Sequence, residues 1–196
     1  RLIDTHPDNM FLHFKHVRIW GKELEAVNVV PPALLSNVTG QGEHQYTVIP
    51  NWGKVPGHEH IGSTHGGIVA DKAGNIYVST DGPNGLIVCK KDGSFVKSYP
   101  QHKRFHGLNI NTENGSEFIY AAAMSKGHKL DLQGNIVLTI DGVSQAPENV
   151  WTKATAVAVA PNGDLFIADG YASSVIFKYD SKGTFIKKFG LKGRAD

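Results

Sequence analysis

The chain has 196 residues, and its 20 Lys and Arg residues nearly balance 18 Asp and Glu, which gives a formal net charge of +2 with histidine neutral. Because the basic residues are scattered rather than gathered in a patch, we do not expect nucleic-acid binding. No apolar run approaches the roughly 18 residues that a membrane-spanning helix requires, so no membrane span is expected either.

The first 43 residues do not follow the pattern of the rest of the chain. Residues 1–43 are therefore interpreted as an N-terminal extension of unclear structure, and residues 44–196 as a separate, repetitive region. Tyr46–Ile49 has the composition of a short strand, and we expect it to be the outermost strand of a sheet that precedes the first clear repeat.

A loop with a cluster of histidines is expected over residues 51–64. It contains His58 and His60, two residues apart, with His65 five residues further on. In extended backbone, side chains two residues apart point to the same side, and a third nearby histidine could complete a metal site. The alternative interpretation is that His58 and His60 are solvated loop residues.

Three repeats follow the histidine-rich loop, over about residues 65–100, 105–141 and 154–190. Each holds four short runs rich in Val, Ile and Phe, separated by short turn segments that contain glycine, such as Asn162-Gly163 and Lys182-Gly183 in the third repeat. Runs of this length with such turns are typical of antiparallel strands joined in sequence. Each repeat therefore predicts a four-stranded antiparallel sheet.

The spacing of equivalent positions supports the repeat. Two sets of residues show the same intervals of 41 and then 49 residues: the turn glycines Gly93, Gly134 and Gly183, and the strand starts His65, His106 and Thr155. The eight additional residues fall in the segment Asp141–Lys153, which is polar and contains a proline, so that a loop is expected there.

A period near forty with four strands per unit is characteristic of a β-propeller blade. Propellers close with four to eight blades, whereas about three clear blades occur in this chain. An open stack leaves strand edges and an apolar face exposed. We therefore expect the rest of the ring to be supplied by further polypeptide of the same protein or by other subunits.

Two histidines stand at corresponding places in adjacent repeats. His65 and His106 each precede a glycine where the first strand of a repeat begins, and first strands line the central channel of a propeller. Imidazole is the most frequent metal ligand in proteins, so converging histidines suit Zn²⁺ or a similar ion. Alternatively, the rings hydrogen-bond to neighbouring loops without binding a metal.

These residues carry a resemblance to NHL-repeat six-bladed propellers, and among them to the lyases that cleave peptidyl-α-hydroxyglycine during peptide amidation. The matching segments are Phe105–Ile110, Thr155–Val159 and Ala168–Tyr171. The resemblance implies that His106 is a zinc ligand, that the backbone carbonyl of Leu108 contributes to a calcium site, and that Tyr171 is catalytic.

The sequence also departs from that family. Val175 stands where the family carries an arginine after its Asp-Gly-Tyr motif, and a second expected arginine has no counterpart in Ser79–Gly85.

Two classes of function follow from the sequence. In the first, a histidine-bound divalent metal polarises an oxygen of a small polar or peptide-derived ligand, and Tyr171 acts as a base or hydrogen-bond donor in a lyase-like reaction. In the second, the propeller is a scaffold without chemistry that presents Asp81–Gly85 and Ser125–His128 to a protein, peptide or glycan. Asn37 and Asn114 begin Asn-x-Thr and Asn-x-Ser sequences, which accords with a secreted or periplasmic location.

Overall fold

The computed structural model describes residues 38–58 and 60–193, and most of the predicted N-terminal extension lies outside this part of the chain. The chain divides into two compact units, residues 1–52 and 53–196, and each is described here by itself.

The described part of the first unit is a hairpin. Strand β1 (Val38–Gln41) pairs antiparallel with β2 (His44–Thr47), and all eight residues are exposed. The strand predicted over Tyr46–Ile49 thus lies slightly earlier in the chain, and its partner is β1.

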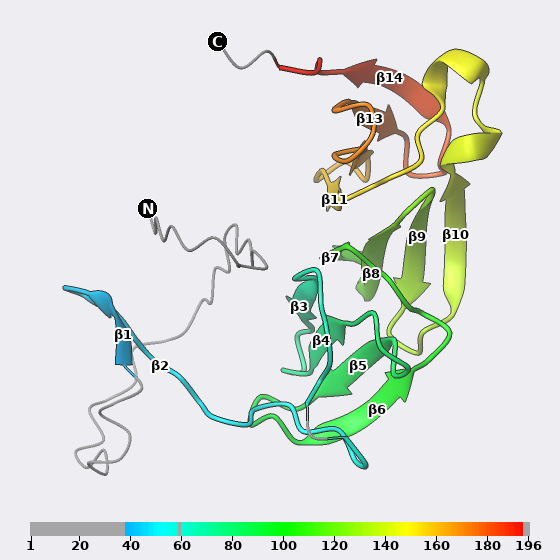
Figure 1. The fold of residues 1–196 in the computed structure, drawn as a ribbon. Coiled ribbons are helices and arrows are strands. Elements are labelled where there is room, and N and C mark those ends of the chain that lie inside the picture. The colour runs from blue at the N-terminus through cyan, green and yellow to red at the C-terminus, as the bar shows by residue number, and fades with distance from the viewer. Residues whose placement is uncertain (1–37, 59, 194–196) are drawn as a thin grey trace. The chain divides into compact units, whose positions relative to one another are not determined.

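The second unit consists of three four-stranded antiparallel sheets, which we call blades 1, 2 and 3 (Figure 1). In each blade every strand pairs with its neighbour in sequence, as the repeat predicts. Blade 1 comprises β3 (Ile68–Ala70), β4 (Ile76–Ser79), β5 (Leu86–Cys89) and β6 (Phe95–Tyr99). Blade 2 comprises β7 (Gly107–Glu113), β8 (Ser116–Ala123), β9 (Lys126–Asp131) and β10 (Ile136–Asp141). Blade 3 comprises β11 (Ala156–Val159), β12 (Leu165–Ala168), β13 (Ile176–Tyr179) and β14 (Phe185–Phe189).

The turn residues act as their chemistry predicts. Asn114 and Gly115 both have positive φ, 48° and 83°, and form the two-residue turn between β7 and β8; this is the backbone that an Asn-Gly hairpin turn requires. In the turn between β9 and β10, the Asp131 carboxylate accepts hydrogen bonds from the backbone N–H groups of Gln133 and Asn135.

The blades are arranged as an arc with their first strands at the inner side (Figure 1). Strand β3 contacts β7, and β7 contacts β11, so the first strands lie side by side. Apolar side chains fill the space between successive blades, among them Ile119 between blades 1 and 2 and Ile167 between blades 2 and 3, each at most 1% exposed. Burial of this kind is the main stabilising contribution to stacked repeats.

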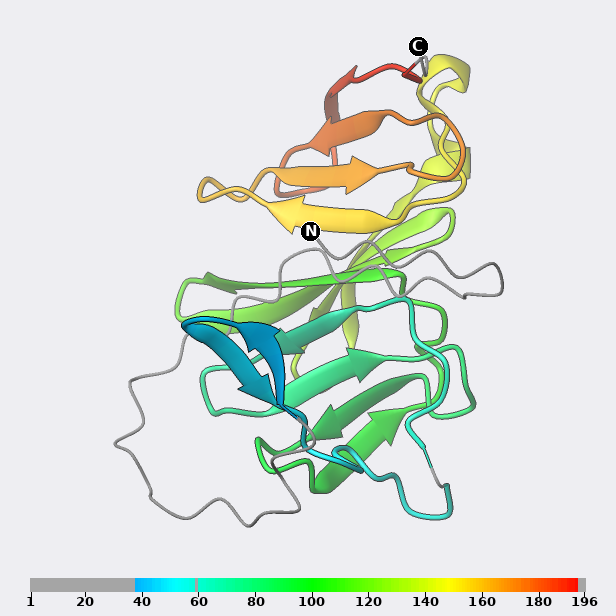
Figure 2. The same ribbon diagram turned by 60° about the vertical axis from the view of Figure 1, so that its left-hand side comes forward.

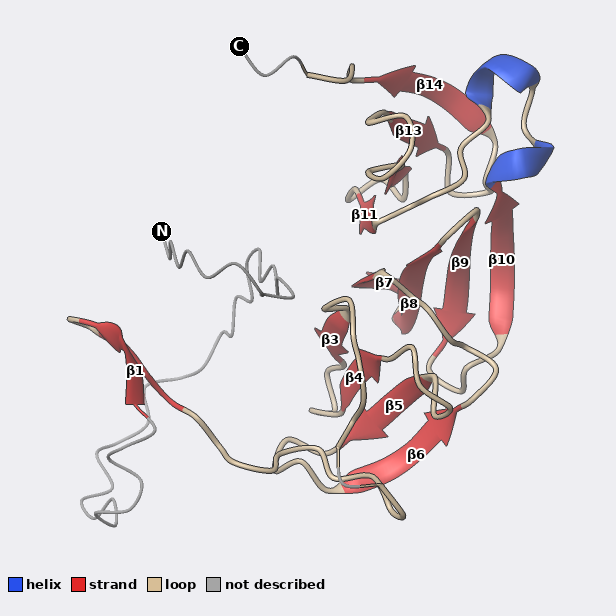
Figure 3. Cartoon of the chain, in the orientation of Figure 1, coloured by secondary structure: helices blue, strands red, loops and turns tan. Residues whose placement is uncertain are grey.

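The segment predicted as a loop, Asp141–Lys153, connects blades 2 and 3. It contains two short 3₁₀ helices, η2 (Gly142–Ser144) and η3 (Pro147–Asn149), which are the helical turns in Figure 3. Trp151 follows them and is 1% exposed within the core between the two blades. The connection is therefore anchored to the blades rather than loose.

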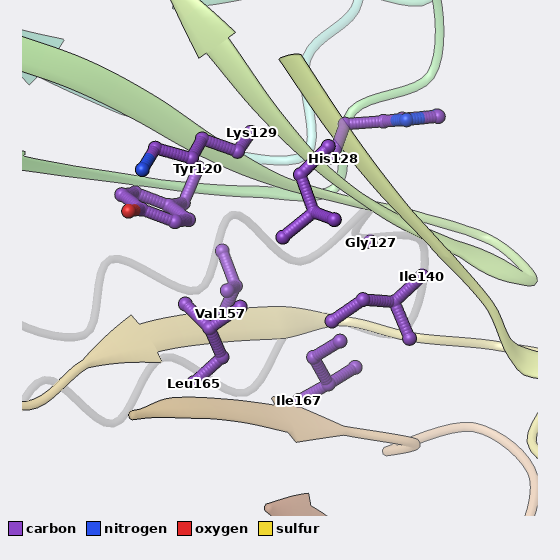
Figure 4. A pocket seen from close by; sticks show the side chains of 9 residues that line it. Tyr120, Gly127, His128, Lys129, Ile140, Val157, Leu165 and Ile167 are labelled. Atoms are coloured by element: carbon purple, nitrogen blue, oxygen red, sulfur yellow. The ribbon is translucent and has the colours of Figure 1, made fainter. Parts of the chain in front are cut away.

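A small void remains between blades 2 and 3, where β9 and β10 face β11 and β12 (Figure 4). Its lining is mostly apolar and consists of Tyr120, Gly127, His128, Lys129, Leu138, Ile140, Val157, Leu165 and Ile167. None of His65, His106 and Tyr171 lines this pocket.

Strands β3, β7 and β11 all begin at one end of the blades, which we call the site end. In Figure 2 the segments that lead into these strands lie on the right-hand side. Because neighbouring strands are antiparallel, the second strand of each blade finishes at the same end. The loops after β4 and β12 therefore lie at the same end as the starts of the first strands.

None of the helices in residues 38–58 and 60–193 is long and apolar enough to cross a bilayer.

Candidate functional site

The site end brings together residues from all three blades. His65 precedes β3, His106 precedes β7, and Tyr171 lies in the loop after β12. The rings of His65 and His106 stack with centroids 4.4 Å apart and planes 18° from parallel. The rings of His106 and Tyr171 form an edge-to-face contact, with centroids 5.1 Å apart. The predicted convergence of the two histidines is thus confirmed, and Tyr171 joins them.

The two histidines are not equivalent in the blades, contrary to the interpretation of the repeat. Gly107 directly follows His106 and pairs with Ala122, while in blade 1 the N–H of Ser79 at the end of β4 donates to the carbonyl of Gly67. A Cβ on either glycine would approach the first strand of the next blade within 3.0 Å, which identifies Gly67 and Gly107 as corresponding positions.

His65 therefore precedes its corresponding glycine by two residues, because Gly66 stands between them. Gly66 has a φ of 90°, a conformation that residues with a side chain rarely adopt. The inserted residue accounts for the stacking, because it places His65 one position further from the start of its strand than His106. In stacked rings the nitrogen lone pairs lie in nearly parallel planes and do not point to a common atom.

Each ring uses one nitrogen in a contact with a neighbouring loop. His65 Nε2 lies 2.9 Å from Asp81 Oδ2, in a pair that is partly exposed. His106 Nδ1 lies 3.1 Å from the carbonyl oxygen of Thr155. A carbonyl can only accept, so His106 Nδ1 carries the proton and Nε2 of the neutral ring presents a lone pair.

Nε2 of His106 is buried and has no hydrogen-bond partner among the described residues. Burial lowers the pKa of His106, and the adjacent His65 lowers it further, so the ring is held neutral. A buried nitrogen without a partner is unusual in a folded protein. Its chemistry fits a metal ion or a hydroxyl donor of a ligand, because either would use the free lone pair.

Tyr171 is the exposed member of the site. Its side chain is 66% exposed at the site end, so its hydroxyl is accessible to a ligand that approaches His106. The loop that carries it follows Asp169, a buried residue whose carboxylate accepts three backbone hydrogen bonds.

The other predicted site residues are less closely connected. His58 and His60 are exposed in the segment that leads to β3. Leu108 is the second residue of β7 and pairs with Ala121. Within residues 38–58 and 60–193, no group of three or more His, Cys, Asp or Glu side chains is placed to hold a metal ion. The roles of His58, His60 and the Leu108 carbonyl in metal binding remain predictions.

Sequence reasoning missed Asp81 as the partner of His65, and it missed the Thr155 carbonyl and Asp169. Asp81 lies in a loop that was considered only as a contact surface. The Asp-Gly-Tyr motif at 169–171 was the available signal for Asp169. The Thr155 contact depends on backbone geometry and left no signal in the sequence.

No protein-family model matches the chain. It is 36% identical over 84 residues to a probable peptidyl-alpha-hydroxyglycine alpha-amidating lyase of Caenorhabditis elegans, which is 41% of this chain and 24% of that protein. It is 35% identical over 89 residues to peptidyl-alpha-hydroxyglycine alpha-amidating lyase 1 of Drosophila melanogaster, covering 43% of this chain and 16% of that protein. Part of this chain is distantly homologous to the amidating lyases.

The match to the amidating lyases is partial, since the chain spans about a quarter or less of the length of each of these relatives. Two solved structures are also similar. A streptogramin B lyase aligns with 65% of this chain and 41% of its own, at 15% identity and a TM-score of 0.49. A protein of unknown function from Bacteroides caccae aligns with 63% of this chain and 50% of its own, at 16% identity and a TM-score of 0.47.

Proposed function

We propose that blades 1 to 3 belong to a six-bladed NHL-type propeller whose site end binds a peptide-derived α-hydroxyglycine and cleaves it as a lyase. One observation carries the proposal: the lone pair of His106 Nε2 is buried without a partner, beside the exposed phenol of Tyr171. The partial homology to the amidating lyases supplies the substrate class.

A peptidyl-α-hydroxyglycine is a carbinolamide, in which one carbon bears both a hydroxyl and an amide nitrogen. Its cleavage removes the hydroxyl proton, breaks the bond between that carbon and the nitrogen, and returns a proton to the nitrogen. The products are a peptide amide and an aldehyde. We assign both proton transfers to Tyr171 Oη: as the phenolate it accepts the hydroxyl proton, and as the resulting phenol it returns that proton to the departing nitrogen. His106 lies beside Tyr171 at the same end of the blades.

His106 is also the residue that would hold a divalent metal ion such as Zn²⁺, because its Nε2 is deprotonated and oriented by the Thr155 carbonyl. A metal there would polarise an oxygen of the ligand. His58 and His60 are secondary candidates as ligands, whereas His65 would have to leave its stacked position on His106 to share the ion. A structural Ca²⁺ at the Leu108 carbonyl belongs to the same proposal. The secretory pathway is the proposed location.

The scaffold alternative has an observation in its favour. Both histidine rings contact neighbouring loops, as expected if the site end only holds loops in place. His65 pairs with the Asp81 carboxylate, and His106 hydrogen-bonds to the Thr155 carbonyl. In that case the loops Asp81–Gly85 of blade 1 and Ser125–His128 of blade 2 bind a protein, peptide or glycan.

The two functions are separated by metal analysis and a substrate assay on the purified protein. We expect a bound metal that chelation removes, loss of that metal in His106→Ala, and aldehyde release from an N-acyl-α-hydroxyglycine that Tyr171→Phe reduces at least 100-fold. His44→Ala, which changes an exposed histidine of the first unit, is the matched control. A wild-type protein that neither takes up metal nor releases aldehyde would overturn the proposal in favour of the scaffold.

A further inference from the structure

The carboxylate of Asp169 connects two segments of blade 3. Asp169 is 1% exposed. Its Oδ1 accepts hydrogen bonds from the backbone N–H of Lys153 at 2.6 Å and of Thr152 at 3.3 Å. Its Oδ2 accepts from the N–H of Ser173 at 3.0 Å. One oxygen thus holds the segment that enters β11, and the other holds the loop between β12 and β13.

Both of these segments lead to His106. Two residues beyond Lys153 is Thr155, whose carbonyl oxygen lies 3.1 Å from His106 Nδ1. Two residues before Ser173 is Tyr171, whose ring contacts the His106 ring. The Asp169 carboxylate therefore joins the two segments that contact His106. One provides the Thr155 carbonyl, which sets the His106 tautomer, and the other provides the Tyr171 ring.

The carboxylate is not needed merely to close its own loop. The backbone carbonyl of Asp169 already accepts hydrogen bonds from the N–H groups of Ala172 and Ser174. In blade 1 the residue after the second strand is Thr80, whose hydroxyl donates to Gly85 within the same loop and joins no other segment. In blade 1 the loop after β4 is joined to the segment before β3 by a backbone hydrogen bond, from the N–H of Asp81 to the carbonyl of Ser63. In the blade that carries Tyr171, a side-chain carboxylate makes the corresponding link.

We infer that Asp169 is a positioning residue of the site end, whose carboxylate fixes the Thr155 carbonyl and Tyr171 on two sides of His106. The inference deepens the proposed function and rests on it for its catalytic meaning, but the positioning itself is independent of any metal or substrate. A carboxylate suits the task because it only accepts, and backbone N–H groups approach both of its oxygens.

The test replaces Asp169 by Asn, which keeps the shape but directs an NH₂ group at a backbone N–H on one side. Asp131→Asn is the matched control, because the Asp131 carboxylate also accepts backbone N–H groups in a turn, away from His106. Nuclear magnetic resonance of the metal-free protein reports the His106 ring tautomer and the proximity of the Tyr171 and His106 ring protons. The Zn²⁺ dissociation constant is measured separately.

In Asp169→Asn we expect loss of the His106–Tyr171 proximity signal, a mixed His106 tautomer and a 10- to 100-fold weaker Zn²⁺ affinity, while Asp131→Asn retains all three. Unchanged His106 signals in folded Asp169→Asn, or equal changes in the control, would overturn the inference. If Asp169→Asn does not fold, Asp169→Glu decides by the same signals, since its longer side chain keeps the charge but displaces both oxygens. A wild type that neither binds Zn²⁺ nor releases aldehyde would refute the proposed function but leave the resonance result intact.

Discussion

The indole N–H of Trp151 donates a 2.7 Å hydrogen bond to the phenol oxygen of Tyr179, and both side chains are buried. Trp151 belongs to the connection between blades 2 and 3, and Tyr179 ends β13. The bond therefore fastens this long connection to the interior of blade 3.

Replacing Tyr179 by Phe should lower the free energy of unfolding by about 1–3 kcal/mol, because the buried Trp151 N–H loses its acceptor. Denaturant titration measures the change. The double variant Trp151→Phe, Tyr179→Phe should cost less than the sum of the two single variants, since both polar groups are then removed. A Tyr179→Phe variant as stable as the wild type would show that the indole finds another partner.

Replacing Gly107 by Ala should also destabilise the protein by about 1–3 kcal/mol, because the added methyl group has no room. Its Cβ would lie 2.8 Å from the Thr155 carbonyl oxygen and 3.0 Å from Ala156 Cα, and backbone atoms cannot turn aside. Thermal unfolding compared with Gly193→Ala, where no atom lies within 4 Å, provides the measurement and its control. Equal melting temperatures for the two variants would contradict the packing described here.

The stability of the protein should fall as the pH drops from 7 to 5, in part through His128. Burial lowers the pKa of His128, and Lys126 and His102 lower it further. The unfolded chain then takes up a proton near the ordinary histidine pKa, whereas the folded chain does so only at lower pH. Stability is complete above the unfolded value and is lost as the pH falls through the folded one.

A His128→Gln variant should therefore show a shallower decrease of melting temperature between pH 7 and pH 5 than the wild type. Parallel slopes for the two proteins would place the pH dependence in other groups.

Removing the charge of Asp81 should change global stability by less than about 1 kcal/mol, because its pair with His65 is partly exposed and screened by solvent. The effect of Asp81→Asn should be confined to the His65 ring, whose contact with His106 can be followed by nuclear magnetic resonance. A large loss of stability would indicate that the pair supports the fold of blade 1.

The sequence was sufficient for the architecture because each strand is bounded by turn residues with specific backbone requirements. Each of the three repeats was predicted to form a four-stranded antiparallel sheet, and each does. The sequence did not indicate how long the strands of blade 2 are, where β8 extends through Ala123 because the turn that follows has only two residues.

The candidate site was only partly predictable. The repeat indicated that His65 and His106 meet, yet a single inserted residue, Gly66, changed how the rings face each other. One residue is within the tolerance of any alignment of repeats, so the sequence could not reveal it. Asp81 and the Thr155 carbonyl were not recognised because their contacts depend on the packing of one blade against another.

The site end draws on residues separated by about a hundred positions in the chain, from His65 to Tyr171. Contacts within a blade are local and can form early, whereas this juxtaposition requires three successive sheets to have docked. The complete cluster of His65, His106 and Tyr171 should therefore be among the last native contacts to appear during refolding. The spectroscopic signature of this cluster would then report when all three sheets have docked, rather than when any one sheet has formed.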